Sequence, residues 1–433
     1  MCKVLYIGRG TILIRKKLKF YVLALLFLLI LLSIVIYRYC KPEEYFPPSQ
    51  TSITEGLGVN VSSDVSEKDI EGIADAGFKW VRIGIAWENV ETHKGEYDFK
   101  STKYDKLSKW LKDNNLKPYY VLYYSNSLYE EKRSIITPKG RKAFAEFVRT
   151  TVQRYKDQDA VWEIWNEPNT QMFWDPQPSY KPYADLVKTV APIIKQYDKS
   201  GTVVAPAVSG LNEESLHWMD SLFKEGVLNN IDAVSVHPYR YSSPESVSKD
   251  YISLRNLIGK YTDKNVSVIS GEWGYSMAHS PDVKLTETQQ ANYLTRIFLI
   301  NAENDIPLSV WYNWKNSGGN LNEKEQNFGV IWYDNEPKLA YLANQNLSKY
   351  LKGYKFSNKI ATVNNRDYVL EFKKGKGKKL IAYWTTEDTH DITVKLGTGS
   401  GKIVSMLGAV RHVSWENSIK LRATKSPSYL IIE

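Results

Sequence analysis

The chain alternates between two hydrophobic patterns, starting near Gly56 and continuing for about three hundred residues. Short apolar runs, typical of buried strands, alternate with longer stretches whose apolar positions recur at helical spacing. The alternation predicts eight buried strands. They are Leu57–Val61, Val81–Ile85, Pro118–Tyr123, Val161–Trp165, Val203–Ala205, Ala233–Val236, Val266–Ile269 and Leu308–Tyr312.

Eight amphipathic helices are predicted after these strands. They are Ser66–Ala76, Tyr104–Asn114, Pro138–Tyr155, Tyr180–Tyr197, Glu213–Lys224, Ser246–Tyr261, Thr286–Glu303 and Leu339–Lys349. Eight strand–helix units match a (β/α)8 TIM barrel in number and length, whereas a doubly wound sheet usually has five or six strands. The sequence therefore predicts an α/β barrel over residues 56–350.

The pattern changes after Lys352 to short alternating runs separated by Gly- and Asn-containing turns, such as Tyr368–Phe372 and Leu380–Trp384. This spacing predicts a small antiparallel β domain, an accessory β-sandwich over residues 351–433. A structural role beside the barrel is the expectation for this domain. The alternative is carbohydrate binding, with Trp384 and Trp415 as stacking platforms.

One apolar stretch near the start of the chain belongs to neither pattern. Residues 20–37 carry no charge, and as a helix they are just long enough to cross about 30 Å of hydrocarbon. A cleaved signal peptide is the competing interpretation, but its apolar core is shorter and ends in small residues, whereas this stretch is followed by Arg38, Tyr39 and Cys40. The stretch therefore predicts a transmembrane anchor, followed by a Pro-rich polar linker over residues 38–55.

The positive charge of the chain is concentrated beside that stretch. Eight Lys and Arg residues precede Glu43, the first acidic residue, so the formal net charge of +9 belongs almost entirely to the leader. The rest of the chain is about neutral, which argues against a nucleic-acid-binding surface. By the positive-inside rule, residues 1–19 are expected in the cytoplasm and the barrel outside the cytoplasmic membrane, periplasmic or extracellular.

Two glutamates lie where a TIM barrel places its catalytic residues, at the carboxyl ends of strands. The fourth strand ends in WEIWNEPN, which contains Asn166 and Glu167, and the seventh ends in VISGEWG, which contains Glu272. The ends of these strands can face each other across the barrel mouth. Two carboxylates at such a short distance can divide their roles, one protonated as an acid and one ionised as a nucleophile.

These motifs resemble those of the retaining glycoside hydrolases of clan A, nearest to family 39 and also similar to family 5. The resemblance covers nearly the whole barrel, including the run from Val81 to Leu122 and the HPY triplet that begins at His237. It implies that Glu167 is the general acid/base, that Glu272 is the nucleophile, and that Asn166 holds the sugar 2-hydroxyl.

Further site residues follow from the same resemblance. Arg82 and Tyr239 match positions that hydrogen-bond the nucleophile, and His237 matches a residue that lines the same subsite. Trp311, at the end of the eighth strand, is the expected sugar platform, although barrel core is an alternative. Five more residues near strand ends are candidate substrate contacts or simply packed side chains. They are Trp87, Tyr124, Asn126, Trp273 and Trp314.

The predicted function is hydrolysis of O-glycosidic bonds in a polysaccharide, by an endo-acting enzyme that processes a bacterial exported or cell-surface polymer. The alternatives are an exo-acting, β-xylosidase-like glycosidase and a non-catalytic polysaccharide-binding scaffold of an envelope-assembly complex. No cofactor or catalytic metal is expected, since the chain has no HExxH or CxxC motif, although a structural calcium ion is left open. Expected partners are the polysaccharide, the membrane and polysaccharide biosynthesis or export machinery.

Overall fold

The computed structural model describes residues 51–279, 285–375 and 377–433. The predicted cytoplasmic segment, the anchor over residues 20–37 and most of the linker lie outside these residues. Within the described ranges, no helix combines the length and apolar composition needed to cross a bilayer. The barrel and the C-terminal sheets belong to one compact unit, Pro48–Glu433.

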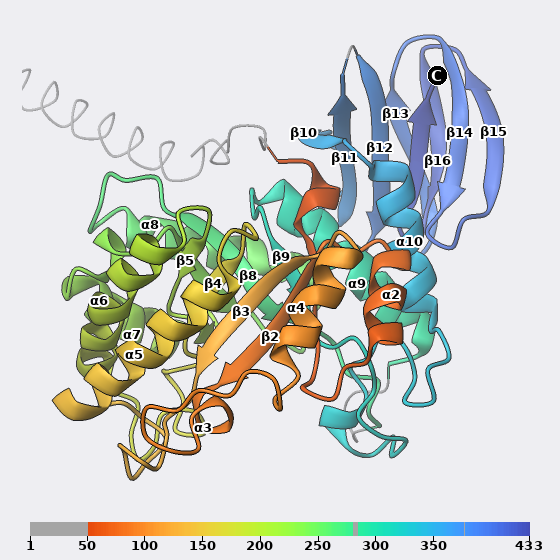
Figure 1. Ribbon diagram of the computed structural model, residues 1–433. Helices are drawn as coiled ribbons and strands as arrows, with labels where there is room; N and C mark the ends of the chain where they lie inside the picture. The colour runs from red at the N-terminus through yellow and green to blue at the C-terminus, as the bar shows by residue number, and fades with distance from the viewer. Residues whose placement is uncertain (1–50, 280–284, 376) are drawn as a thin grey trace, which may run out of the picture. The chain divides into compact units, whose positions relative to one another are not determined.

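The predicted barrel is confirmed. Its parallel strands follow the order β5-β4-β3-β2-β1-β9-β8-β7-β6, and a further β5–β7 pairing closes the sheet, with β5 and β6 together forming the fifth barrel strand. Helices surround these strands (Figure 1). The strands are β1 (Leu57–Asn60), β2 (Trp80–Ala86), β3 (Lys117–Tyr123), β4 (Val161–Ile164), β5 (Thr202–Val204), β6 (Val208–Ser209), β7 (Ala233–His237), β8 (Ser267–Trp273) and β9 (Ser309–Trp311).

The helices begin where the sequence supplies caps. The Ser66 side chain accepts from the backbone of Asp69 in a capping box, and Thr137 caps a helix whose first residue is Pro138. The helices are α2 (Glu67–Asp75), α3 (Trp87–Val90), α4 (Tyr104–Asp113), α5 (Pro138–Tyr155), α6 (Tyr180–Tyr197), α7 (Glu213–Lys224), α8 (Ser248–Ile258), α9 (Glu287–Glu303) and α10 (Leu339–Leu351). Short 3-10 turns are η1 (Ile53–Gly56), η2 (Val227–Asn229), η3 (Pro244–Val247) and η4 (Lys324–Gln326).

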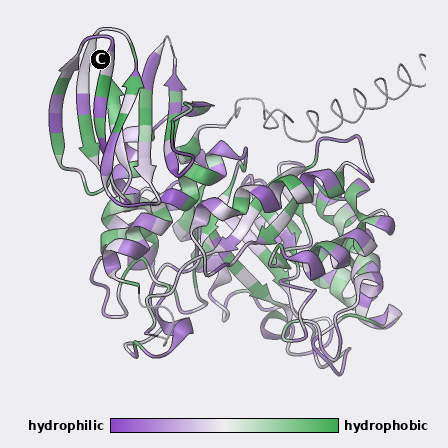
Figure 2. Ribbon diagram, turned by 180° about the vertical axis from the view of Figure 1, so that it is seen from behind, coloured by the Kyte–Doolittle hydropathy of each residue, from purple (hydrophilic) through white to green (hydrophobic). Residues whose placement is uncertain are grey.

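The C-terminal residues form antiparallel sheets, as predicted. Six strands pair in the order β10-β11-β12-β17-β14-β15, and β13 pairs with β16. Burial alternates along β13 and β16, whereas six consecutive residues of β12 are buried. Hydrophobic and hydrophilic residues mix along these strands (Figure 2). They are β10 (Lys355–Lys359), β11 (Asp367–Lys374), β12 (Lys378–Thr385), β13 (His390–Lys395), β14 (Gly399–Ser405), β15 (Val410–Trp415), β16 (Ser418–Ala423) and β17 (Ser428–Ile432).

A hydrogen bond to a buried ion pair joins the barrel to this β domain. Arg296 on α9 donates to both carboxylate oxygens of Glu245 in η3, each at 2.6 Å. The Trp384 indole on β12 donates to the same carboxylate at 2.8 Å. Trp384 is fully buried and Trp415 is 7% exposed. Burial therefore removes both tryptophans as sugar platforms and favours the structural role of the domain.

Candidate active site

The end of β4 is held in an unusual backbone conformation. Trp165 and Glu167 have φ angles of 73° and 47°, in the left-handed region that residues other than glycine rarely adopt. The backbone N–H of Trp165 donates to Leu122, and that of Glu167 donates to Ala207. These bonds, to β3 and to the segment between β5 and β6, hold a sharp turn, which sets the direction of the Glu167 side chain.

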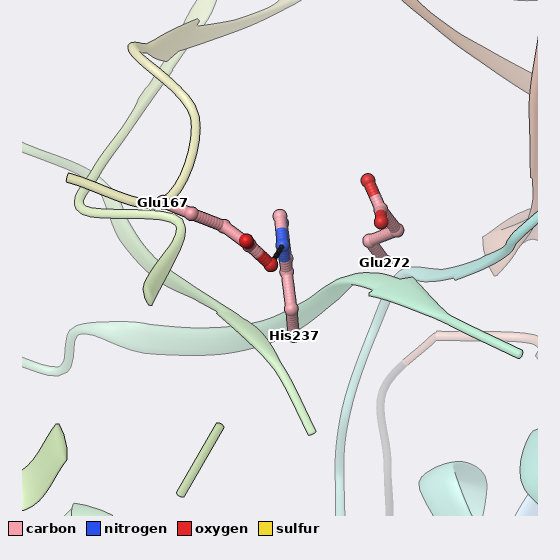
Figure 3. A group of neighbouring side chains, drawn as sticks. All are labelled: Glu167, His237 and Glu272. Carbon is pink, nitrogen blue, oxygen red and sulfur yellow. Dashed lines mark hydrogen bonds and ion pairs between the residues drawn. The ribbon is translucent and has the colours of Figure 1, made fainter. Parts of the chain in front are cut away.

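Glu167 and Glu272 approach each other at the barrel mouth, with His237 between them (Figure 3). One carboxylate oxygen of each glutamate and one ring nitrogen of His237 lie within 4.8 Å of one another. Glu167 is hydrogen-bonded to His237 Nδ1 at 2.8 Å. Both glutamates are largely buried, with side-chain exposures of 12% and 14%. The two predicted catalytic carboxylates are therefore brought together.

Arg82 on β2 connects the site residues. Its Nη1 donates to Glu272 at 2.6 Å and to Asn60 at 3.0 Å, and its Nη2 donates to Asn166 at 2.7 Å. Its Nε and Nη2 both donate to Glu163, at 3.0 and 2.7 Å. Burial lowers the pKa of Arg82, but the charges of Glu163 and Glu272 outweigh burial and raise it above the ordinary value. Arg82 is therefore a permanent cation shared by two carboxylates.

Glu163, in the interior of β4, is fully buried. Its second oxygen accepts from the Tyr119 hydroxyl at 2.6 Å. Burial raises the pKa of Glu163, but the charge of Arg82 and hydrogen bonds to the carboxylate hold it below the ordinary value. A Cβ atom at Gly271 would lie 2.1 Å from Ser235 Oγ and 3.1 Å from Glu163, so the absent side chain leaves this carboxylate its space.

Three other predicted site residues lie beside Glu167 and Glu272. The Tyr239 hydroxyl donates to Glu272 at 2.8 Å. Burial, and next the charge of Glu272, raises the pKa of Tyr239 well above its ordinary value, so the phenol stays a hydrogen-bond donor. Asn166 binds Arg82 through its side-chain oxygen, and the Tyr124 hydroxyl lies within hydrogen-bonding reach of the Asn166 side chain.

The structure places the tryptophan candidates away from the mouth. Trp273 and Trp311 are fully buried, and the Trp311 indole donates to the backbone of Phe328. Trp314 is 3% exposed and donates to Asp69. Because side chains alternate along a strand, Trp273 points away from the face that presents Glu272. Trp273 and Trp311 therefore pack in the barrel instead of making the expected sugar contacts, whereas Trp314 also lines a cavity beside the ends of β1 and β9.

The same correction applies to two residues near the second and third strands. Trp87 is fully buried, donates to Glu91 at 2.6 Å and stacks on Tyr129. Asn126 is 2% exposed, and its amide donates to the backbone oxygen of Glu91 at 2.7 Å. Both residues therefore hold the loop around Glu91 and do not line the site.

Several site residues were not predicted. Tyr312, next to Trp311, is partly buried, and its pKa is raised by burial and then by the charges of Glu272, Glu325 and Glu167. Tyr312, whose ring centroid lies 6.5 Å from that of Tyr239, is therefore a further aromatic residue near Glu167 and Glu272. Burial, with the charges of Glu272 and Glu167, raises the pKa of Glu325 in η4 despite the neighbouring Lys324. The other unpredicted residues are Asn60, Tyr119 and Glu163.

Among the residues that the structure describes, one group of His and acidic side chains has the composition of a metal site, and it is Glu167, His237 and Glu272. Glu272 already accepts from the Arg82 cation, and Glu167 is hydrogen-bonded to His237. A metal ion would have to compete with Arg82 for the same carboxylate. The contacts therefore favour an acid–base pair over a metal centre.

Solved structures of glycoside hydrolases share this fold. A family 39 glycoside hydrolase from Bacteroides cellulosilyticus WH2 matches with a TM-score of 0.75 and 23% identity, over 89% of this chain and 82% of that one. A family 39 β-xylosidase from Caulobacter crescentus matches with a TM-score of 0.64 and 14% identity, over 89% and 98%. The family 30 subfamily 8 xylanase Xyn30A from Clostridium acetobutylicum matches with a TM-score of 0.66 and 14% identity, over 89% and 97%.

A family model provides the assignment that these distant structures do not. The model described as cellulase, glycosyl hydrolase family 5, matches residues 48–317, which is more than half of the chain. Together with the neighbouring structures, this match confirms the predicted resemblance to clan A and the O-glycosyl hydrolase activity. The chain therefore belongs to the cellulase family, glycosyl hydrolase family 5, within clan A of the glycoside hydrolases.

Proposed function

We propose that the protein hydrolyses a polysaccharide with retention of configuration, Glu272 acting as nucleophile and Glu167 as general acid/base. The observation that carries the proposal is the close approach of their carboxylates, with one oxygen of each within 4.8 Å of the other. Retaining enzymes separate the two carboxyl groups by about 5–5.5 Å, whereas inverting enzymes need about 6.5–9.5 Å to admit a water molecule.

The surroundings of the two glutamates support this division of roles. Glu272 accepts from the Arg82 cation and from the Tyr239 hydroxyl, so its ionised form is stabilised for attack on the anomeric carbon. Glu167 instead faces His237. Arg82 has no acceptor atom, so His237 Nε2, at 3.5 Å from it, is the accepting nitrogen and Nδ1–H donates to Glu167.

Each step then has a named group. Glu272 forms the bond to the anomeric carbon while Glu167 gives its proton to the departing oxygen. Glu167, now ionised, removes a proton from water, whose oxygen displaces Glu272 and regenerates the enzyme. The anomeric carbon is inverted twice, so the product has the configuration of the substrate.

The stereochemical test incubates the protein with a panel of aryl β-glycosides and polysaccharides. Proton NMR of the first product is expected to show the anomer of the substrate. Glu272→Gln and Glu167→Gln are expected to lose roughly 10³-fold or more in kcat, since each removes a group used in bond making or breaking. An inverted first product, or full activity in Glu272→Gln, would contradict the mechanism.

Cleavage inside a chain is proposed over removal of single sugars. A cavity of about 270 Å³ lies beside the ends of β1 and β9, lined by Asn313, Ser62 and Tyr333 among others, and Tyr333 is 55% exposed. This cavity, at the same end of the barrel as Glu167 and Glu272, supports a binding path for further sugar units. Size analysis of early products separates the modes, since an endo enzyme yields mixed oligomers and a β-xylosidase-like enzyme yields monomers.

Tethering outside the cytoplasmic membrane is proposed from the apolar stretch over residues 20–37 and the cations before it. An anchored hydrolase suits processing of the cell's own exported polysaccharide, alongside biosynthesis or export machinery. Fractionation with protease treatment of intact spheroplasts tests this topology. The full-length chain is expected in the membrane fraction with its barrel accessible to protease. Release of the barrel as a soluble, shortened chain would contradict retention of the anchor.

A further inference from the structure

Arg82 divides its donors between two carboxylates of different kinds. Nη1 reaches the proposed nucleophile Glu272, while Nε and Nη2 reach Glu163. Glu163 is fully buried and Arg82 is 4% exposed, whereas Glu272 faces the mouth. The mechanism uses Glu272 but leaves a buried, charged glutamate behind it without a role.

Glu163 is itself held on several sides. The Tyr119 hydroxyl donates to one oxygen and Arg82 donates twice to the other. Ser235 is a further hydrogen-bonding neighbour, and the missing side chain of Gly271 leaves room for this arrangement. A carboxylate with so many partners has little rotational freedom, so it can fix the plane of the guanidinium bound to it.

We propose that Glu163 is a positioning residue of the glycosidase reaction, which orients Arg82 toward Glu272 and shares its positive charge. This inference rests on the proposed role of Glu272 as nucleophile. With Glu163 ionised, the positive charge of Arg82 is shared between two carboxylates. Arg82 then holds Glu272 in place without fully neutralising it, so the nucleophile keeps its electron density for the anomeric carbon. Without that charge, Arg82 is expected to bind Glu272 more tightly and to lower its reactivity.

Other groups also act on the two carboxylates. Those that face Glu272 are Arg82, Tyr123, Tyr124, Glu167, His237, Tyr239, Tyr312 and Glu325. Those around Glu163 are Arg82, Tyr119, Tyr183 and His237. Glu163→Gln changes one charge and leaves every other group in place. Any movement of the acidic limb of the pH profile in this variant is therefore assigned to the loss of that charge.

The experiment compares Glu163→Gln with Glu245→Gln, measuring kcat, KM and the pH profile of kcat/KM on the aryl glycoside that the wild type hydrolyses. Both variants remove the charge of a buried carboxylate paired to arginine. Glu163→Gln is expected to lose roughly 10–100-fold in kcat with little change in KM. Its acidic limb is expected to move to lower pH. Glu245→Gln is expected to keep the kcat and pH profile of the wild type.

Glu163→Asp keeps the charge but shortens the side chain. The acidic limb of its pH profile is therefore expected at the wild-type position, while kcat stays reduced. Tyr119→Phe removes one donor to Glu163 and covers the case in which Glu163→Gln does not fold. Its kcat is expected to fall at unchanged KM. Wild-type kcat and pH profile in Glu163→Gln, or wild-type kcat in Tyr119→Phe, would overturn the inference. Activity of Glu272→Gln would instead overturn the proposed function, so the two failures are distinguishable.

Discussion

Two buried arginine–glutamate pairs in this protein have the same chemistry and different surroundings. Arg82 and Glu163 lie inside the barrel, and Arg296 and Glu245 lie where the barrel meets the β domain. In both pairs the partners are at most 4% exposed. Burying a pair costs desolvation free energy that the mutual attraction only partly offsets, so neither pair is explained by stability alone.

The difference lies in what else the arginine reaches. Arg82 continues to Glu272, Asn166 and Asn60, so its pair extends into the catalytic mouth. Arg296 lies over the Tyr293 ring at 5.3 Å, and none of its described hydrogen bonds reaches a catalytic carboxylate. The comparison teaches that a buried ion pair gains a chemical role only when one partner has donors left for a reacting group.

The largest effect is expected when each arginine is removed. Arg82→Met and Arg296→Met each leave a buried carboxylate without its cation, which is expected to cost about 3–5 kcal/mol of unfolding free energy. Only Arg82→Met is expected to lose activity, roughly 10²–10³-fold in kcat, because it also removes a cation from Glu272, the proposed nucleophile. Urea unfolding and steady-state kinetics measure the two effects. Equal losses of kcat per folded molecule would break the comparison.

Removing both charges of a pair sharpens the comparison. Glu245→Gln with Arg296→Met leaves an acceptor for the Trp384 indole, and its stability is expected to return to within about 1–2 kcal/mol of the wild type. Glu163→Gln with Arg82→Met is expected to stay inactive, since Glu272 still lacks its cation. Double-mutant cycles on unfolding free energy and on kcat measure the couplings. Recovery of activity in the barrel double variant would count against the role of Arg82.

Trp384→Phe tests whether the β-domain pair influences the mouth at all. The change leaves one buried Glu245 oxygen without its indole donor, which is expected to cost about 1–3 kcal/mol of unfolding free energy. Activity at 25 °C is expected to be unchanged, as measured by kcat and KM. A fall in kcat at constant folded fraction would show that the β domain acts on the catalytic residues through η3.

The smallest effect is expected from a third buried basic residue, Lys338, none of whose described hydrogen bonds reaches a carboxylate. Lys338 donates to Asn316 and lies over the Trp332 ring at 4.4 Å, and burial lowers its pKa from 10.5 to about 7. Between these values the unfolded chain binds the proton and the folded protein does not, so stability rises with pH. The rise is at most about 1.4 kcal/mol for one pH unit.

Lys338→Met provides the matching measurement. Unfolding free energies at pH 7.5 and 8.5 are expected to differ less in this variant than in the wild type, by the contribution of one titrating group. If the unfolding free energy changed equally with pH in both proteins, the titrating group would be a residue other than Lys338.

The barrel was predictable because its elements obey simple periods. The helices Pro138–Tyr155, Tyr180–Tyr197 and Glu213–Lys224 have the bounds that their apolar spacing predicts. The fifth strand was harder to predict, since it is divided into Thr202–Val204 and Val208–Ser209. Periodicity describes continuous elements, and it carries no signal for a strand that is interrupted and resumes.

The aromatic side chains show where prediction from the sequence ends. Both faces of a barrel strand are buried, so Trp311 and Tyr312 both suit a buried position. No alternation of polar and apolar residues indicates which of the two rings faces the barrel axis. Glu163 did leave a signal. A charged residue within the apolar run VWEIW requires a buried partner, and Arg82 lies in the comparable run VRIGIA. Pairing these two residues would have predicted the ion pair.

Gly271 has a consequence for how a mutational scan of this protein would be interpreted. The residue has no functional group, yet a methyl group there would collide with Ser235 and crowd Tyr119 and Glu163. Loss of turnover at position 271 would therefore identify a reserved volume, not a missing chemical group. A larger residue at position 271 would therefore require a compensating change at Ser235.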